Sequence, residues 1–544
     1  MKSFSFQDRQ KNIEQMKQSE FDLVIIGGGI NGAGVARDAA ARGMSVALIE
    51  GNDFASGTSS RSSKLIHGGI RYLENLDFKL VFEALNERSR LFEMAPHLVH
   101  PLRFMIPLYE DGRVGMNKMG LGMWLYDALA LFQAPEMHER LDAPESVERM
   151  PALRTQKLSG SFVYSDAYMD DDRLVHETLR SANEFGALCA SYVKATGANF
   201  DSAGKISEVV CEDQISKEKF SIKARHVISS VGPWTDQLGT TLFKDWKKIL
   251  RPTKGIHLTL PKHRLPLSSA VVMAAEKSDR IVFGIPRHEM IIIGTTDTDF
   301  KDSPETVGAT PEDVKYLLEV TDHYFPGAKI TAHDIIATYA GVRPLVNDGS
   351  STEGKTSREH TIIDDPRGVT FVAGGKYTTY RLMCEQVVSA ALKSFPLEEK
   401  VKFKKADTTQ PLNELASVEA CEQAKVLASV WAKKTGKPEE EMTLLADRYG
   451  MEAELILNSY PTKYTYWQLE AAQAIDHTMC FHMRDFYTRR VPLFLSNRNH
   501  GVQFMDEVGE VFKEKLGWSD SQLKDEMHQL TEYMAHEVEW KKHI

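Results

Sequence analysis

Residues 21–50 read FDLVIIGGGINGAGVARDAAARGMSVALIE, and this stretch decides the fold. The apolar run at 23–26 is typical of a buried parallel strand. A glycine-rich turn follows, then a helical pattern through Ala41 and a second short apolar run at 45–49. Strand, glycine turn, helix and second strand together predict a βαβ unit that binds a dinucleotide.

The glycine spacing in this unit has a physical reason at each position. In the pattern Gly27-x-Gly29-x-x-Gly32, the glycines allow a tight turn, close approach of a pyrophosphate, and close packing of helix on strand. The helix N-terminus attracts phosphate, and the acid ending the second strand is placed to accept from a ribose hydroxyl. The motif alone does not separate NAD from FAD, and a glycine-rich turn of another α/β protein is the alternative. The candidate cofactor contacts in this unit are Gly27, Gly29, Ile30, Asn31, Gly32 and Glu50.

Composition limits the class of protein. The chain has 544 residues, 42% hydrophobic and 26% charged, which suits a soluble protein of several domains. Its net charge of -10 argues against nucleic acid as a partner. Five scattered cysteines without a CxxC pair predict neither a disulfide scaffold nor a metal site. We expect no secretory signal and no spanning helix, because the N-terminus is polar and no run of eighteen apolar residues occurs.

Three further segments bear on the nucleotide. TSSRSSKLIHGGIRYL, from residue 58, combines hydroxyl side chains with two glycines that permit close approach of backbone to a planar ring, although a solvated loop is the alternative. HVISSVGPW, residues 226–234, reads as a strand end that crosses a cofactor or as an ordinary strand end. GVTFVAGGKYTTYR, from residue 368, predicts a strand, two glycines and a helix starting near Thr378.

That late helix favours a flavin. Its N-terminus would face the electron-rich edge that develops negative charge when a flavin is reduced. A late strand-Gly-Gly-helix paired with an early GxGxxG is hard to explain in an NAD enzyme. The candidate cofactor contacts outside the βαβ unit are Thr58, Ser59, Ser63, Lys64, His67, Gly68, Gly69, Gly232, Gly375, Lys376 and Thr378.

Six motifs together resemble the FAD-dependent glycerol-3-phosphate dehydrogenase family, of the respiratory, flavin-linked type. The resemblance covers roughly residues 20–395 and, more loosely, the helical tail. The motifs are GGGINGAGVARDAAARG (27–43), TSSRSSKLIHGGIRYLE (58–74), APHLVHPLRFMIP (95–107), YSDAYMDDDRLV (164–175), GVRPL (341–345) and GGKYTTYR (374–381).

The resemblance implies an α/β fold. We expect a Rossmann-like FAD-binding domain of the glutathione-reductase and D-amino-acid-oxidase type, an inserted α+β substrate domain, and a helical C-terminal domain. The expected FAD-binding domain comprises 21–105, 170–250 and 345–398. The expected substrate domain comprises 106–169 and 251–344, and the helical domain 399–544.

The resemblance also implies a reaction and its residues. Members of the family oxidise sn-glycerol 3-phosphate to dihydroxyacetone phosphate, with hydride passing to FAD and electrons to quinone. Because no histidine or cysteine of the sequence stands out as an attachment point, we expect the FAD to be bound non-covalently. A phosphate needs cations, and a secondary hydroxyl needs a base, for which histidine is suited. By this resemblance Arg343 binds the phosphate, His257 is the base, and Arg71 flanks the substrate; these are the expected catalytic residues. The expected substrate contacts are Arg71, Tyr72, His257, Arg343, Lys376 and Thr379.

Other readings stay open. A glycerol-3-phosphate oxidase using dioxygen shares the same first half-reaction. An amine or amino-acid oxidase of the same fold, or a non-catalytic flavin-binding regulator, would not need this set of cations. Without the family context, Arg343 reads as a solvated turn residue and His257 as a structural histidine.

Two segments bear on partners and location. Residues 112–133 are unusually apolar and fit either a helix lying at a membrane surface or a buried core helix. Residues 481–495 alternate arginines with aromatics, which is typical of a solvated helical face, with anionic headgroups or a second subunit as alternatives. We expect a cytoplasmic protein, peripheral on the inner face of the cytoplasmic membrane and in contact with quinone. A homodimer is compatible with the sequence, which does not determine the oligomeric state.

Overall fold

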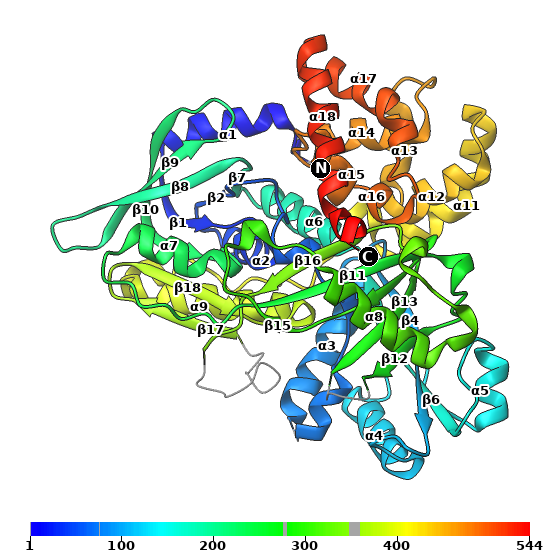
Figure 1. Ribbon diagram of the computed structural model, residues 1–544. Coiled ribbons are helices and arrows are strands. Elements are labelled where there is room, and N and C mark those ends of the chain that lie inside the picture. The colour runs from blue at the N-terminus through cyan, green and yellow to red at the C-terminus, as the bar shows by residue number, and fades with distance from the viewer. Residues whose placement is uncertain (1, 76, 276–279, 348–359, 544) are drawn as a thin grey trace.

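In the computed structural model, which describes residues 2–75, 77–275, 280–347 and 360–543, two β-sheets lie side by side. A group of helices from the C-terminal part of the chain lies above them in the view of Figure 1. The strands of the second sheet lie in the sequence between strands of the first, so the chain crosses from one sheet to the other more than once.

The first sheet contains the nucleotide-binding core. Its main path runs β17-β18-β10-β1-β2-β7; β9 pairs with β10 outside this path, and β8 pairs with β9. The neighbours β18, β10, β1, β2 and β7 are parallel, whereas β17, β9 and β8 join antiparallel. The strands are β1 Glu20–Ile26, β2 Val46–Ile49, β7 Leu188–Ala190, β8 Val193–Phe200, β9 Ile206–Asp213, β10 Lys219–Ser229, β17 His360–Asp365 and β18 Val369–Gly374.

Both faces of β1 are buried, which explains its unbroken apolar run. Leu23 and Ile25 face one core with the helices α2, α6 and α9, and Val24 and Ile26 face another with α1 and α7. These helices are α1 Phe6–Gln18, α2 Ile30–Ala41, α6 Asp171–Glu184, α7 Thr235–Leu242 and α9 Tyr380–Ala391.

The second sheet carries the predicted substrate residues. Its path is β15-β11-β14-β13-β12-β4-β6-β3, with β16 paired to β11 and β5 to β6. The strands are β3 Leu65–Ile66, β4 Val99–Tyr109, β5 Glu139–Leu141, β6 Leu158–Met169, β11 Thr253–Pro261, β12 Ala270–Ala274, β13 Ile281–Arg287, β14 Met290–Gly294, β15 Thr298–Asp299 and β16 Thr338–Arg343. The helices around it are α3 Phe78–Met94, α4 Met116–Leu129, α5 Ala143–Arg149 and α8 Pro311–Tyr324.

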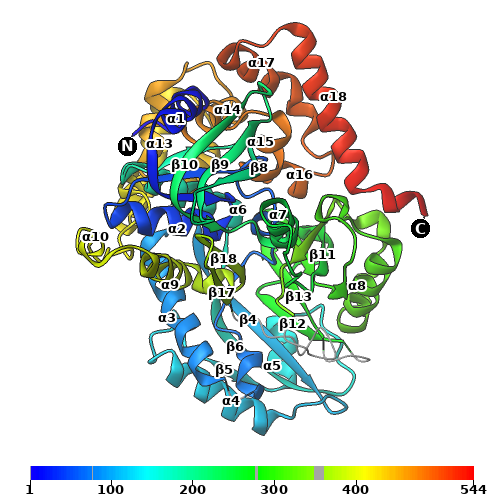
Figure 2. The same ribbon diagram turned by 90° about the vertical axis from the view of Figure 1, so that its left-hand side faces the viewer.

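The C-terminal part is helical. The short helix α10 precedes this part of the chain. The C-terminal helices that follow share one apolar core with residues of the second sheet. Figure 2 shows α17 and α18 at the end of the molecule opposite α4. The helices are α10 Leu397–Lys400, α11 Val418–Thr435, α12 Glu439–Tyr449, α13 Glu452–Ser459, α14 Tyr466–His477, α15 Met483–Arg489, α16 Leu493–Ser496, α17 Met505–Leu516 and α18 Asp520–Glu537.

The predicted fold class is confirmed, including the βαβ start, the inserted second sheet and the helical tail. The predicted domain boundary between residues 105 and 106 falls inside β4, which pairs with β6 along its whole length. Among the described residues, none of the helices combines the length and the apolar character needed to cross a bilayer.

Candidate active site

The glycine turn after β1 presses the chain against the start of α2. Gly27 has a φ of +112°, a conformation that strains other residues. A Cβ built on Gly32 would lie 1.8 Å from the carbonyl oxygen of Gly27. The N–H of Ile30 donates to Ser59 Oγ at 3.0 Å. The turn thereby brings the positive end of the α2 dipole to the wall of a cavity.

Glu50, directly after β2, fixes the shape of this turn. Its Oε2 accepts from the N–H of Gly28 at 2.7 Å, and its Oε1 accepts from the N–H of Asn52 at 2.9 Å. Burial raises the pKa of Glu50, and the two backbone donors oppose that effect. Each carboxylate oxygen has a second lone pair, so Glu50 can also accept from a ribose hydroxyl.

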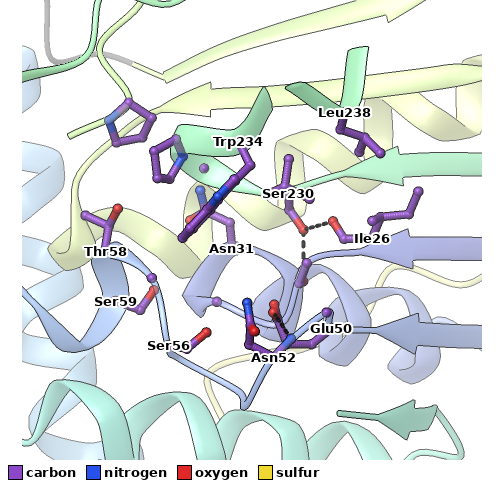
Figure 3. A pocket seen from close by; sticks show the side chains of 18 of the residues that line it. Ile26, Asn31, Glu50, Asn52, Ser56, Thr58, Ser59, Ser230, Trp234 and Leu238 are labelled. Carbon is purple, nitrogen blue, oxygen red and sulfur yellow. Dashed lines mark hydrogen bonds between the residues drawn. The ribbon is translucent and has the colours of Figure 1, made fainter. Parts of the chain in front are cut away.

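The cavity has a volume of about 450 Å³ and extends from Glu50 past the glycine turn to Tyr377. The segment 51–61, which we call the cavity loop, contributes Ser56, Thr58 and Ser59 to one wall, and Trp234 lies across from them (Figure 3). At the glycine turn, Ser230 Oγ donates at 3.2 Å to the carbonyl oxygens of Ile26 and Gly27.

Many of the predicted cofactor contacts line this cavity. They are Gly27, Gly29, Ile30, Asn31, Glu50, Thr58, Ser59, Gly232, Gly375 and Lys376. The other candidates lie outside its described lining: Gly32, Ser63, Lys64, His67, Gly68, Gly69 and Thr378.

Local contacts explain several of these exceptions. Lys64 is buried and pairs with Asp171. The N–H of His67 donates to Thr378 Oγ1 at 3.2 Å, and the N–H of Gly68 donates to the Tyr126 hydroxyl at 3.0 Å. The first bond joins the segment after the cavity loop to the turn before α9, where the flavin-facing helix was predicted, and the second joins it to α4.

Other lining residues were not predicted. They come from segments far apart in the sequence, most of them next to the first sheet and Glu305 next to the second, and include Asn52, Ser56, Gly57, Lys194, Gln214, Trp234, Gln237, Glu305 and Tyr377. Trp234 Nε1 donates to Glu305 Oε1 at 2.5 Å, and both residues line the cavity. The motif HVISSVGPW signalled only the Trp234 neighbourhood, because the other residues have no local pattern.

His257 lies in β11 with its ring in a slot between strands. The ring stacks on Tyr339 of β16, with centroids 4.7 Å apart, and a Cβ on Gly294 of β14 would lie 2.1 Å from the imidazole. Its Nε2 is 2.8 Å from Ser63 Oγ. Nδ1 is buried and has no hydrogen-bond partner within the described part of the chain. Burial, and then the charges of Arg343 and Lys64, lower the pKa of His257 well below its ordinary value.

Arg343 ends β16 and lies on the same face of the sheet as His257. A Cβ on Gly255 would lie 2.3 Å from Arg343 Nη2, so the guanidinium covers Gly255. Gly255 and His257 are two residues apart in β11 and therefore face the same side. Arg343 Nη1 is 3.1 Å from Asp297 Oδ1, and Nη2 donates to Thr295 Oγ1 at 3.0 Å.

The remaining predicted substrate residues lie near the start of α9. Lys376 Nζ lies 3.5 Å from the ring centroid of Tyr72, and Lys376 lines the cavity. Thr379 Oγ1 donates to the carbonyl oxygen of Lys376 at 3.4 Å. Gly375, Lys376 and Thr379 also line a second cavity of about 200 Å³. The side chain of Arg71 lies outside what the structure describes.

The residues of the larger cavity fit a dinucleotide. They combine an acid at a strand end, a helix N-terminus beside a glycine turn, and hydroxyl side chains along the cavity loop. The cavity then leads toward the start of α9, whose N-terminus suits an electron-rich ring system.

Comparisons with known proteins agree with this description. The family described as FAD dependent oxidoreductase matches residues 22–381, and the family described as C-terminal domain of alpha-glycerophosphate oxidase matches residues 419–523. The aerobic glycerol-3-phosphate dehydrogenase of Staphylococcus saprophyticus is 34% identical over 95% of both chains. That of Staphylococcus aureus is 32% identical over 94% of both. The crystal structure of glycerol-3-phosphate dehydrogenase from Bacillus halodurans complexed with FAD is 27% identical, with a TM-score of 0.81 over 98% of both chains.

Proposed function

The chain belongs to the FAD-dependent oxidoreductase family and, within it, to the aerobic glycerol-3-phosphate dehydrogenases, and on this premise we propose that it oxidises sn-glycerol 3-phosphate to dihydroxyacetone phosphate. The bound FAD would accept the two electrons of this oxidation. The residues that would hold FAD are those that line the larger cavity, with Glu50 at one end and Lys376 toward the other.

The observation that carries this proposal is the position of a cation and a base on one face of the second sheet. Arg343 offers a planar guanidinium to the phosphate, and Asp297 and Thr295 orient it before substrate arrives. A bound phosphate and the Asp297 carboxylate would both interact with the Arg343 guanidinium, so the substrate phosphate competes with Asp297 for hydrogen bonds to Arg343.

His257 is the residue to take the hydroxyl proton. If Nε2–H donates to Ser63, the lone pair of Nδ1 remains to accept a proton. The lowered pKa keeps this imidazole neutral near pH 7, which is the form that a base requires. Arg343 contributes to that lowering, so the cation that attracts the phosphate also keeps the base uncharged.

Anaerobic stopped-flow absorbance of the purified holoenzyme tests the proposal. Glycerol 3-phosphate should bleach the flavin band quickly, whereas glycerol and an amino acid should not. Glycerol is the matched control, because it has the same secondary hydroxyl and lacks only the phosphate. Bleaching by the amino acid alone would indicate an amino-acid oxidase, and the proposed substrate would be withdrawn.

We further propose quinone as the electron acceptor and the membrane surface as the place where the acceptor is met. α4 buries Met123 and Tyr126 and exposes Leu121, Trp124 and Leu125. Leu131 and Phe132 follow it and are more than half exposed, and α3, which contacts α4, exposes Phe78 and Phe82. A patch of this kind suits contact with lipid. The proposed location is the inner face of the cytoplasmic membrane.

A glycerol-3-phosphate oxidase that uses dioxygen is the second candidate. The match at residues 419–523 favours this candidate, because that family is described as the C-terminal domain of alpha-glycerophosphate oxidase. Peroxide formed at the rate of substrate oxidation in air would support the oxidase. Electron transfer to a quinone in vesicles, with little peroxide, would support the dehydrogenase.

A further inference from the structure

The cavity loop is tied at both of its ends to the C-terminal helices. Near its start, Asp53 is 1% exposed and pairs with Arg489 and Arg490, at the end of α15. At its other end, Arg61 pairs with Glu537, the last residue of α18. Between these anchors lie the loop residues that line the cavity: Ser56, Gly57, Thr58 and Ser59.

The first anchor is a buried charge cluster. Arg489 Nε donates to Asp53 Oδ2 at 2.6 Å, and Arg490 donates from Nη1 to Oδ2 and from Nη2 to Oδ1, both at 2.8 Å. Arg490 is itself held by Thr478, whose Oγ1 accepts from Nε at 2.7 Å. Burial alone would raise the pKa of Asp53, but the two arginines lower it below the ordinary value. Both arginines were predicted on a solvated face; that expectation was wrong, because this carboxylate is buried against them.

The second anchor holds the loop against the substrate strands as well. Arg61 Nη1 donates to Glu537 Oε1 at 3.1 Å and to the carbonyl oxygen of Ala340 at 3.3 Å, and Nη2 donates to the Tyr533 hydroxyl at 3.2 Å. Thr338 Oγ1 in turn donates to the carbonyl oxygen of Glu537 at 2.6 Å. The end of α18 therefore contacts both the cavity loop and β16, the strand that carries Arg343.

We propose that the C-terminal helices act as a clamp that holds the cavity loop in the conformation that binds FAD. A loop held in its binding conformation loses less conformational entropy when the ligand binds, so the complex is tighter and dissociates more slowly. The positioning residues of the clamp are Asp53, Arg61, Arg489, Arg490 and Glu537. The inference rests on FAD as the cofactor and not on the identity of the substrate.

A buried ion pair also contributes to folding, so the test needs an interdomain pair that does not touch the loop. Arg180 of α6 and Glu452 of α13 form such a pair, with Nη2 2.6 Å from Oε1 and both side chains 3% exposed. Glu452→Gln removes a charge between the same two parts of the chain and leaves the cavity loop intact. It is the matched control for loop variants.

The experiment measures the rate at which FAD dissociates from each diluted holoenzyme. The released FAD is detected by the rise in flavin fluorescence. The loop variants, each of which weakens one anchor, are Asp53→Asn and Glu537→Gln; the second serves if the first does not fold, because Glu537 pairs with one arginine whereas Asp53 pairs with two. We expect both to release FAD about ten-fold faster than the wild type or more, and Glu452→Gln to stay within about two-fold. Circular dichroism at the same temperature reports that each variant is folded.

Three outcomes would overturn the clamp. The first is release of FAD by folded loop variants at the wild-type rate, and the second is release by Glu452→Gln as fast as by the loop variants; either result would make the ion pairs structural only. Isolation of a wild-type protein that neither carries nor takes up FAD would remove the cofactor itself. Because no substrate is added, a failure of glycerol 3-phosphate to react leaves this test unchanged.

Discussion

The guanidinium of Arg343 occupies the space that a side chain on Gly255 would need, since a Cβ there would lie 2.3 Å from Nη2. Gly255 lies two residues before His257 in β11, and the absence of a side chain there is therefore a condition for the position of the guanidinium beside His257. Gly294 does the same for His257 from the neighbouring strand β14. Two glycines in adjacent strands thus make room for the cation and the base.

Arg343→Ala is expected to raise the KM for glycerol 3-phosphate by about ten- to a hundred-fold, the range that a hydrogen bond to a charged group gives. FAD content should not change, because Arg343 lies outside the described lining of the larger cavity. Gly255→Ala should move KM in the same direction, because the new methyl group displaces the guanidinium. Steady-state kinetics and the flavin absorbance of the purified variants measure both quantities. Loss of FAD with unchanged KM would assign Arg343 to the cofactor instead.

His257→Ala is expected to slow anaerobic flavin reduction strongly near pH 7, with a smaller loss at high pH, where hydroxide can take the substrate proton. The wild-type rate at saturating substrate should stay level as pH falls through 6.5, because the pKa of His257 is lowered well below that value. It should decline only at lower pH, as the imidazole becomes protonated. Ser63→Ala, which removes the hydrogen bond to Nε2 but keeps the base, should lose less. Unchanged single-turnover reduction in His257→Ala would exclude this residue as the base.

The parts of the site that depend only on residues close together in the sequence could be predicted. Gly27, Gly32 and Glu50 form one local βαβ pattern, and each lies where that pattern predicts. The start of α9 is local in the same way. These features could be found because strands and helices have characteristic apolar patterns and the glycine turn between them has a fixed spacing.

The parts that depend on the fold left no such pattern. Lys194 and Gln214 reach the cavity from β8 and from the turn between β9 and β10, and nothing in their local sequence marks them. Arg489 and Arg490 looked like solvated charges because their partner, Asp53, lies more than four hundred residues away. A buried carboxylate and its arginines are recognised only when the fold brings them together.

Acid pH should destabilise the fold through buried histidines. Burial and the nearby Arg490 lower the pKa of His176 well below its ordinary value. The unfolded chain therefore binds a proton below about pH 6.5 that the folded chain does not, and stability falls with pH by up to about 1.4 kcal/mol per pH unit for each such group. His176→Gln should weaken this dependence, measured as the difference between urea unfolding at pH 7.5 and 5.5. His528→Gln, on the exposed face of α18, is the control and should keep the wild-type difference. Equal differences in all three proteins would contradict the assignment.

The exposed apolar side chains of α4 should determine binding to lipid. Trp124 is 59% and Leu121 75% exposed, although both are large and apolar. Inserting such a side chain into the bilayer interface gains about 1.5–3 kcal/mol, so Trp124→Ser or Leu121→Ser should weaken binding about ten-fold or more. Cosedimentation with vesicles of anionic lipid measures this, and the rate with a soluble electron acceptor should stay at the wild-type value. The control is Val426→Ser on α11. Val426 is 76% exposed, much like Leu121, but lies far from α4, so this substitution should leave binding unchanged. If the α4 variants sediment with vesicles as well as the wild type does, this patch is not the membrane-facing surface, and the quinone must be reached from another side of the molecule.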